Sequence, residues 1–234
     1  MMKAQELIQK NSLSHERIMA VKGSRKADGT IVDEPIIEDR LKYDEEWDRQ
    51  LMTNVALGNM CKIIYNTAEK KIYVIGKSSN ASAVTMLCDF YRKAILNLSL
   101  EAAKRKTRLS KTILLSGGKK TISSKELMKI EKEEIESISD YLFGAVAGLK
   151  DALERKEQIF SSEVFSTEDA GIVSSITGRE VIRRNVDKIA EYIKRAYPYL
   201  GRASFKGGGN SNSMSYQRGH ADGGGLGSGQ KRLN

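Results

Sequence analysis

Residues that commonly build catalytic and metal sites are scarce in this chain of 234 residues, which has two histidines and two cysteines. His15 and His220 lie more than 200 residues apart, and neither has a partner at the H-x-x-x-H spacing of a zinc site. Cys61 and Cys88 are too few for a disulfide framework. We therefore expect no metal, no cofactor and no catalytic residue, and we interpret both cysteines as small buried hydrophobic residues.

Long apolar runs are absent as well. No stretch approaches the roughly 18 residues that a membrane span needs, and no secretory signal opens the chain. We expect no membrane partner and a cytoplasmic location, the default for a chain with so few cysteines and no export signal.

Phosphate-binding and hydrolase motifs are also missing. The glycine-rich end `GHADGGGLGSGQKRLN` lacks the P-loop spacing, because Gln230 separates Gly229 from Lys231 and no serine or threonine follows the lysine. The dinucleotide pattern G-x-G-x-x-G fails there too, and the G-x-S-x-G of serine hydrolases is absent. These absences exclude the common nucleotide-binding and acyl-transfer sites.

Charge is abundant but unevenly distributed. The net charge is +9, which favours anionic partners such as nucleic acid. Ala102–Lys125 contains eight lysines and arginines and no carboxylate, whereas Asp33–Asp48 contains eight carboxylates. The chain is therefore electrostatically polar rather than uniformly basic.

The basic stretch is the strongest indication of function, since its cations can neutralise several phosphates. No aromatic residues are interleaved with it, so it does not indicate base stacking. The alternative interpretation is a solvated charged face. The candidate nucleic-acid-binding residues are Lys104, Arg105, Lys106, Arg108, Lys111, Lys119 and Lys120.

The acidic stretch permits a magnesium-site hypothesis, because hard cations take oxygen ligands. Asp44 and Asp48 precede Glu69-Lys70-Lys71, a loose likeness to the D…E-x-K pattern of restriction-type nucleases. Glu69, however, falls in the polar turn `NTAEKK`. We favour a solvated face with charges that begin a helix.

Residue periodicity predicts an α+β fold with an N-terminal helical segment, a helix plus β-hairpin, long amphipathic packing helices and a glycine-rich C-terminal tail. Trp47, Leu51 and Val55 recur on one face of a helix, and `MCKIIYNTAEKKIYVIGK` follows it as a hairpin. Further helices are expected over about 80–106, 123–156 and 178–197, and a short strand at `GIVSSI`.

Several local features refine these elements. `ILLSGGKK` is predicted to be a loop or short hairpin, and a short strand is expected near Gly29–Val32. Thr177 with Glu180 forms a capping box. Gly144 and Gly148, four residues apart, indicate close helix packing.

The domain organisation follows from these elements. We expect a partial N-terminal helical module over 1–20, a connector over 21–42 and an α+β domain over 43–199. A glycine-rich tail over 200–234 carries ten of the twenty glycines. Within it we expect a short helix docked through Tyr216 and Gly219, followed by a flexible end from Gly224.

The opening `MMKAQELIQKNSLSHERI` resembles the phage and prophage module called domain of unknown function 2786, through Ala4-Gln5, Leu7, Leu13-Ser14 and Ile18. That family's earlier helix is missing, which suggests a late start or a shortened homologue. The rest is similar to its companion, domain of unknown function 7168, in the region of Trp47, `VIGKSSNASAV`, `YLFGAVAGL` and `SYQRGHADG`. The resemblance implies a phage or prophage protein, in the host cytoplasm, with no catalytic residues to carry over.

Three functions remain open. The first is a non-enzymatic accessory protein that binds DNA or RNA non-specifically through the basic stretch. The second is a protein-interaction module or modulator of a host or phage protein, with 33–48 and the N-terminal helix as docking surfaces. The third is a metal-dependent nuclease. The sequence does not indicate an oligomeric state.

Overall fold

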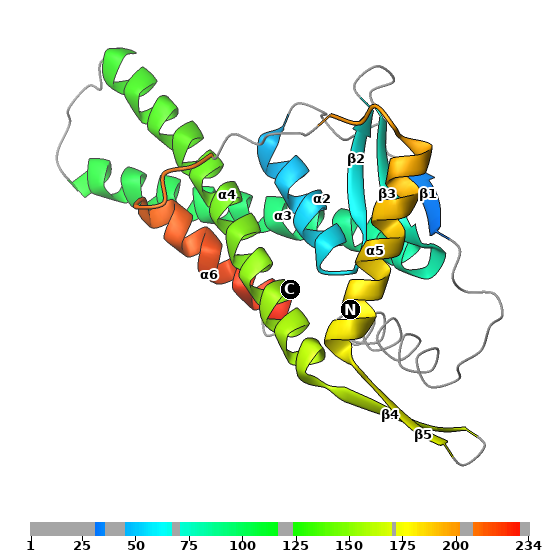
Figure 1. Cartoon of the computed structure of the whole chain (residues 1–234). Coiled ribbons are helices and arrows are strands. Elements are labelled where there is room, and N and C mark those ends of the chain that lie inside the picture. The colour runs from blue at the N-terminus through cyan, green and yellow to red at the C-terminus, as the bar shows by residue number, and fades with distance from the viewer. Residues whose placement is uncertain are drawn as a thin grey trace. The chain divides into compact units, whose positions relative to one another are not determined.

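The computed structural model describes residues 31–35, 45–66, 71–116, 124–169, 172–201 and 208–229. They fold as an α+β protein, as predicted. The chain forms two compact units, and each is built from two separate stretches: Met1–Asp89 with Ala152–Phe205, and Phe90–Asp151 with Lys206–Asn234. The long helices α3 (Ser78–Ser116) and α4 (Ser124–Ser162) each contribute to both units (Figure 1).

The first unit contains a three-stranded antiparallel sheet in the order β1-β3-β2. Its strands are β1 (Ile31–Pro35), β2 (Lys62–Asn66) and β3 (Lys71–Lys77). The predicted hairpin is confirmed as β2 and β3, with Ile64 opposite Tyr73. The strand expected near Gly29–Val32 corresponds to β1, which lies two to three residues further along the chain.

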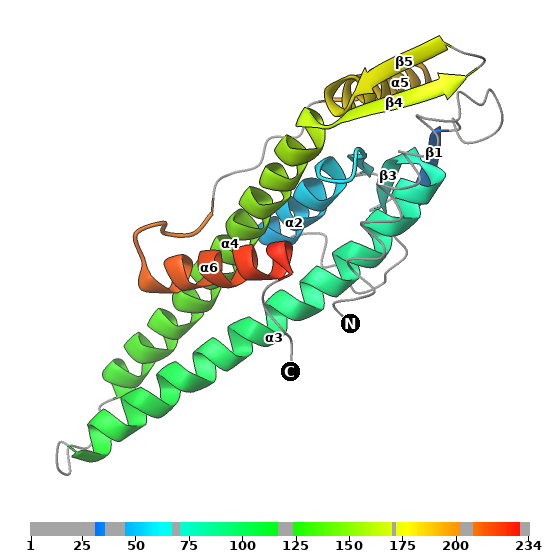
Figure 2. The same ribbon diagram turned by 90° about the horizontal axis from the view of Figure 1, so that it is seen from below.

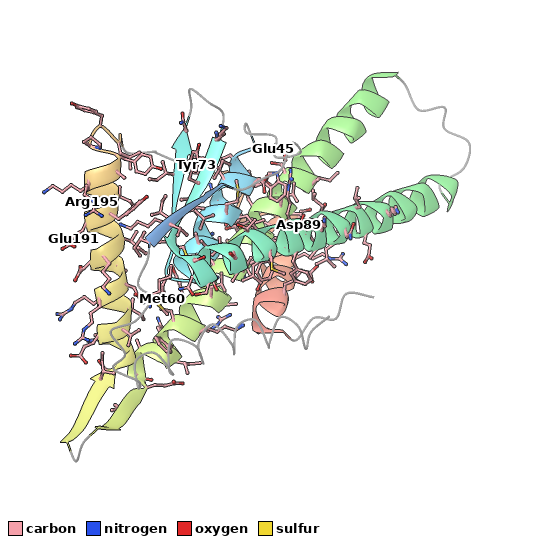
Figure 3. All side chains as sticks on the ribbon, turned by 90° about the vertical axis from the view of Figure 1, so that its right-hand side faces the viewer. Glu45, Met60, Tyr73, Asp89, Glu191 and Arg195 are labelled. Atoms are coloured by element: carbon pink, nitrogen blue, oxygen red, sulfur yellow. The ribbon has the colours of Figure 1, made fainter. Side chains whose placement is uncertain are left out.

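Helices cover both faces of this sheet within the first unit. On one face, Ile64 and Ile75 form a buried cluster with Ile189 of α5 (Gly178–Ala196). On the other face, the Tyr65 hydroxyl donates a hydrogen bond to the Arg49 carbonyl oxygen of α2 (Glu46–Leu57), at 2.9 Å. Figure 3 shows α5 as a separate layer beside the sheet. The side of α5 that faces away from the sheet is therefore open to solvent.

A second, two-stranded sheet connects α4 to α5. Strand β4 (Val164–Asp169) pairs antiparallel with β5 (Ile172–Thr177). The segment `GIVSSI` was predicted as a strand and is confirmed as β5, whereas β4 was not expected. The sequence `VFSTED` ends in polar residues and lacks strict alternation, and its strand character comes from pairing with β5.

The second unit is organised around contact between α4 and α6 (Met214–Ser228), which cross closely in Figure 2. A Cβ atom added at Gly144 would overlap the Tyr216 carbonyl, and one at Gly148 would overlap the His220 carbonyl. The same holds in reverse for Gly219 against the Tyr141 carbonyl. The two backbones approach so closely that only glycine fits, which confirms the packing role predicted for Gly144 and Gly148.

Two predicted elements extend further than expected. We expected a loop or hairpin at `ILLSGGKK`, but `ILLS` is the last turn of α3. We expected a flexible end from Gly224, but α6 continues through Ser228. For α6 the local composition is a weak guide, because contact with α4 stabilises a helix that propensity alone would not. The predicted N-terminal helical segment and the first residue of the helix expected over 123–156 lie outside the described residues.

Candidate nucleic-acid interface

The predicted basic stretch lies mainly on the C-terminal part of α3. Lys104 is exposed there. By the 3.6-residue repeat of the helix, Lys104, Arg108 and Lys111 fall on one face of α3. For the four predicted residues of the helix after Lys104, which include Arg108 and Lys111, only the backbone is described, and Lys119 and Lys120 lie outside the described residues. The helix thus brings together three of the seven predicted cations.

A second set of cations, not singled out from the sequence, lies on α5. All six are exposed, and they extend over about 24 Å at the helical rise of 1.5 Å per residue. No carboxylate in the described part of the chain forms an ion pair with any of them. These residues, called here the α5 basic face, are Arg179, Arg183, Arg184, Lys188, Lys194 and Arg195.

Packing on the sheet is what exposes this face. Val181 and Ile189 are buried on the side of α5 that contacts the sheet, as is Asn185, whose amide donates to the Met60 sulfur at 3.4 Å. The helix places the intervening residues on the opposite side. In Figure 3 the labelled side chains of Arg195 and Glu191 project away from the sheet.

Three carboxylates share the exposed side of α5, but one is engaged by the helix itself. Glu180 accepts a hydrogen bond from the Thr177 backbone N–H at 2.9 Å, and Thr177 in turn accepts from the Glu180 N–H. The backbone hydrogen bond lowers the pKa of Glu180, so the carboxylate stays ionised as a cap. Glu180 stays charged near Arg183 and Arg184, so three carboxylates, Glu180, Asp187 and Glu191, oppose the six cations.

The carboxylates of the nuclease hypothesis do not form a site in the described residues. Asp48 is 1% exposed, so it is not part of a solvated face as we had expected. Glu46 lies one turn from Arg49 on α2 and pairs with it at 2.5 Å. Asp44 and Glu69 lie outside the described residues. Among the described residues, no group of three histidine, cysteine or acidic side chains is arranged to hold a metal ion.

Both cysteines are buried, as predicted. Burial raises the pKa of the Cys88 thiol, and the nearby Asp48 carboxylate raises it further. A thiol with a raised pKa is protonated at neutral pH and is a poor nucleophile. A Cβ atom added at Gly76 would clash with the Cys61 sulfur, so the thiol packs closely against the sheet. The arrangement indicates packing rather than covalent chemistry.

His220 and two tyrosines belong to the docking of α6. His220 Nε2 lies 3.0 Å from a carboxylate oxygen of Asp151 on α4. The Tyr141 hydroxyl donates to Asp222 at 2.5 Å. Tyr216 stacks on His220 with ring centroids 6.5 Å apart. The sequence places these partners 69 and 81 residues apart, so it carried no signal that would pair them.

No protein-family model matches the chain, and neither a curated protein nor a solved structure matches it. Across the described helices, none combines the length and the apolar character that crossing a bilayer requires.

The sequence carries a signal for the α5 basic face. In `GREVIRRNVDKIAEYIKRA` the apolar residues repeat at helical spacing, and six cations fall between them. Alternation with carboxylates makes the segment less conspicuous than the acid-free stretch at 102–125. The structure adds the exposure and the lack of ion pairs that separate these cations from an ordinary surface helix.

Proposed function

We propose that this protein is a non-enzymatic accessory protein that binds DNA or RNA without sequence specificity. The α5 basic face carries the proposal, since six exposed cations along one helix provide a row of phosphate contacts. Over about 24 Å such a row runs alongside roughly seven phosphates of one strand. The cations predicted on α3, Lys104 first among them, provide a separate candidate surface for nucleic acid on the second unit.

The resemblance of the sequence to phage and prophage families suggests the setting. A protein of this kind acts on nucleic acid in the host cytoplasm and needs no catalytic residues of its own. The burial of Asp48 weighs against the nuclease alternative, because a carboxylate enclosed by protein cannot reach a scissile phosphate.

Fluorescence anisotropy with labelled duplex DNA, single-stranded DNA and RNA over a salt series tests the proposal. The wild-type protein should bind all three at low salt and lose affinity steeply as salt rises, because binding releases counterions. The variant Arg183→Gln/Arg184→Gln/Lys188→Gln should bind more weakly. Its slope of log K against log[salt] should be shallower by about two to three, since each lost phosphate contact removes about 0.9.

A matched control on the same face is Asp187→Asn/Glu191→Gln, which removes two negative charges and should strengthen binding. The α3 variant Lys104→Gln/Arg108→Gln/Lys111→Gln measures the contribution of the predicted stretch. Absence of binding at low salt, or binding that salt does not weaken, would refute the proposal. A protein partner recovered from nuclease-treated lysate in its place would favour the interaction-module alternative.

A further inference from the structure

One large side chain of the first unit has no role in its packing. Tyr199 is 99% exposed, the highest value among the exposed large hydrophobic residues of the described chain. It makes no hydrogen bond and no ring contact in the part of the chain that the structure describes. Tyrosine usually buries most of its ring when it stabilises a fold. Tyr199 therefore contributes little to the stability of the unit.

The backbone that carries Tyr199 is nevertheless held in place. Helix α5 ends at Ala196, and the backbone N–H of its C-cap residue Tyr197 donates to the Ile193 carbonyl at 2.8 Å. A turn follows, closed by the Leu200 N–H donating to the Tyr197 carbonyl at 3.2 Å. Pro198 occupies the first central position of that turn, where its fixed φ is favourable. The tyrosine is thus presented on an ordered turn.

The turn is also anchored to the core. The Tyr197 ring is partly buried against the cluster of Ile64, Ile75 and Ile189 that joins α5 to the sheet. Tyr197 points inward and Tyr199, two residues later, stands in solvent. An exposed ring on an anchored turn loses little conformational freedom when it binds a flat partner.

Two basic residues precede Tyr199 in the chain, by five and four positions, and they indicate the chemistry of its partner. Lys194 and Arg195, the last cations of the α5 basic face, lie on the final turn of the helix and are exposed. An aromatic ring next to exposed cations is the combination with which proteins bind single-stranded nucleic acid, the cations holding the backbone and the ring stacking on a base. Bases in a duplex already stack on one another, so a base face becomes available to a side chain in a single strand.

We propose that Tyr199 is a stacking platform for one base of single-stranded nucleic acid, with Lys194 and Arg195 holding the adjacent phosphates. This inference rests on the proposed function and specifies its substrate class. The α5 basic face accepts the backbone of any nucleic acid, and Tyr199 makes the protein prefer a single strand. It also places base stacking on the turn that follows α5, rather than on the stretch at 102–125 that lacks aromatic residues.

The test compares Tyr199→Ala with the wild-type protein on labelled oligo(dT) and on a duplex of random sequence. Affinity for oligo(dT) should fall by about 5- to 150-fold, the range that loss of one stacked base brings. Affinity for the duplex should stay within about twofold. The salt slope should be unchanged, because the substitution removes no charge. Since Tyr199 is fully exposed, the variant folds as the wild type does.

Two further variants separate stacking from other effects. Tyr199→Phe keeps the ring and should keep most of the affinity for oligo(dT). Tyr199→Trp adds an exposed indole to a protein whose other tryptophan, Trp47, is buried at 6% exposure. Its added fluorescence should be quenched when oligo(dT) binds, and the wild-type spectrum should change little.

The outcomes distinguish the two proposals. If Tyr199→Ala binds oligo(dT) as tightly as the wild type, the stacking proposal is wrong, and the proposed function stands as long as the α5 charge variant still weakens binding. Equal loss of single-strand and duplex affinity also overturns stacking. If the wild-type protein binds neither polymer at low salt, both proposals fail.

Discussion

At the scale of single residues, the contact between α4 and α6 depends on glycines, which have no Cβ atom. A Cβ at Gly223 would overlap the Ala145 carbonyl, whereas one at the next residue, Gly224, would lie 3.7 Å from the Gly148 carbonyl oxygen, an ordinary contact distance. The obstructing atoms at Gly223 are backbone, which cannot move aside as a flexible side chain can. Two adjacent glycines of one helix therefore have opposite tolerances.

Gly223→Ala should destabilise the protein by about 1–3 kcal/mol, because the added methyl group forces the two helix backbones apart. Gly224→Ala is its matched control and should be neutral or stabilising by up to about 1 kcal/mol, since alanine favours a helix more than glycine does. Urea unfolding of both variants measures the difference. Equal midpoints for the two would contradict the close backbone contact.

Residue properties that depend on local sequence were predictable, and those that depend on distant partners were not. The burial of Cys61 and Cys88 and the packing role of Gly144 and Gly148 followed from residue type and spacing. The burial of Asp48 did not, because a carboxylate in the first turn of an amphipathic helix normally faces solvent, and here it is buried near Tyr65 of the sheet and Cys88 of α3.

At the scale of elements, α5 shows how a capping motif of a few residues sets the start of a helix and thereby the position of its charged face. The Thr177 and Glu180 capping box, predicted from sequence, is present with both of its hydrogen bonds. It sets the first turn, and the buried Val181 and Ile189 then set the rotation. The orientation of the α5 basic face follows from these four residues.

Thr177→Ala should lower stability by about 1 kcal/mol, the usual cost of losing an N-cap side chain. Thr177→Ser retains the hydroxyl group and should stay close to the wild type. Chemical denaturation monitored by circular dichroism compares the two.

The cap should also weaken at low pH. The pKa of Glu180 is lowered in the fold, so the contribution of its carboxylate to stability is present above the ordinary value of 4.5 and is lost as the pH falls below it. A Thr177→Ala variant as stable as Thr177→Ser would show that the cap is dispensable.

The elements also differ in how far the sequence predicts them. Most helices and the β2–β3 hairpin were predictable, because amphipathic periodicity is a local property. Helix α6 was only partly so. Its glycines lower helix propensity, and it is stable because α4 accommodates its backbone closely. The candidate site followed the same rule: the cations on α3 were predicted by a continuous charged run, whereas exposure on α5 and at Tyr199 needed the fold.

At the scale of the whole molecule, each unit holds buried acidic groups that are neutral at physiological pH. Burial raises the pKa values of Tyr65 and Cys88 in the first unit and of Tyr141 in the second, and the Asp222 carboxylate adds to the effect on Tyr141. In the unfolded chain these groups titrate near their ordinary values of 9.0 for the thiol and 10.0 for the phenols. Above those values the unfolded state loses protons that the folded state retains.

These three groups should therefore leave stability unchanged up to about pH 9 and lower it at higher pH, with a slope that approaches about 1.4 kcal/mol per pH unit for each group. Urea midpoints measured from about pH 8 to 11 check this. The double variant Tyr65→Phe/Tyr141→Phe should be less stable at pH 8, because it loses the hydrogen bonds of both hydroxyls, but its stability should decline less steeply. An unchanged slope would mean that neither phenol titrates on unfolding.

The distance in sequence between α4 and α6 has a consequence for synthesis. Gly144 and Gly148 are translated well before the helix that packs on them is complete, since Ser228 lies 80 residues after Gly148. At about 5–20 residues per second, translation of the intervening chain takes roughly 4–16 s. The contact between α4 and α6 therefore forms only after α5 has been made, and a ribosome that stalls within α5 leaves a nascent chain in which the glycine surface of α4 has no helix packed on it.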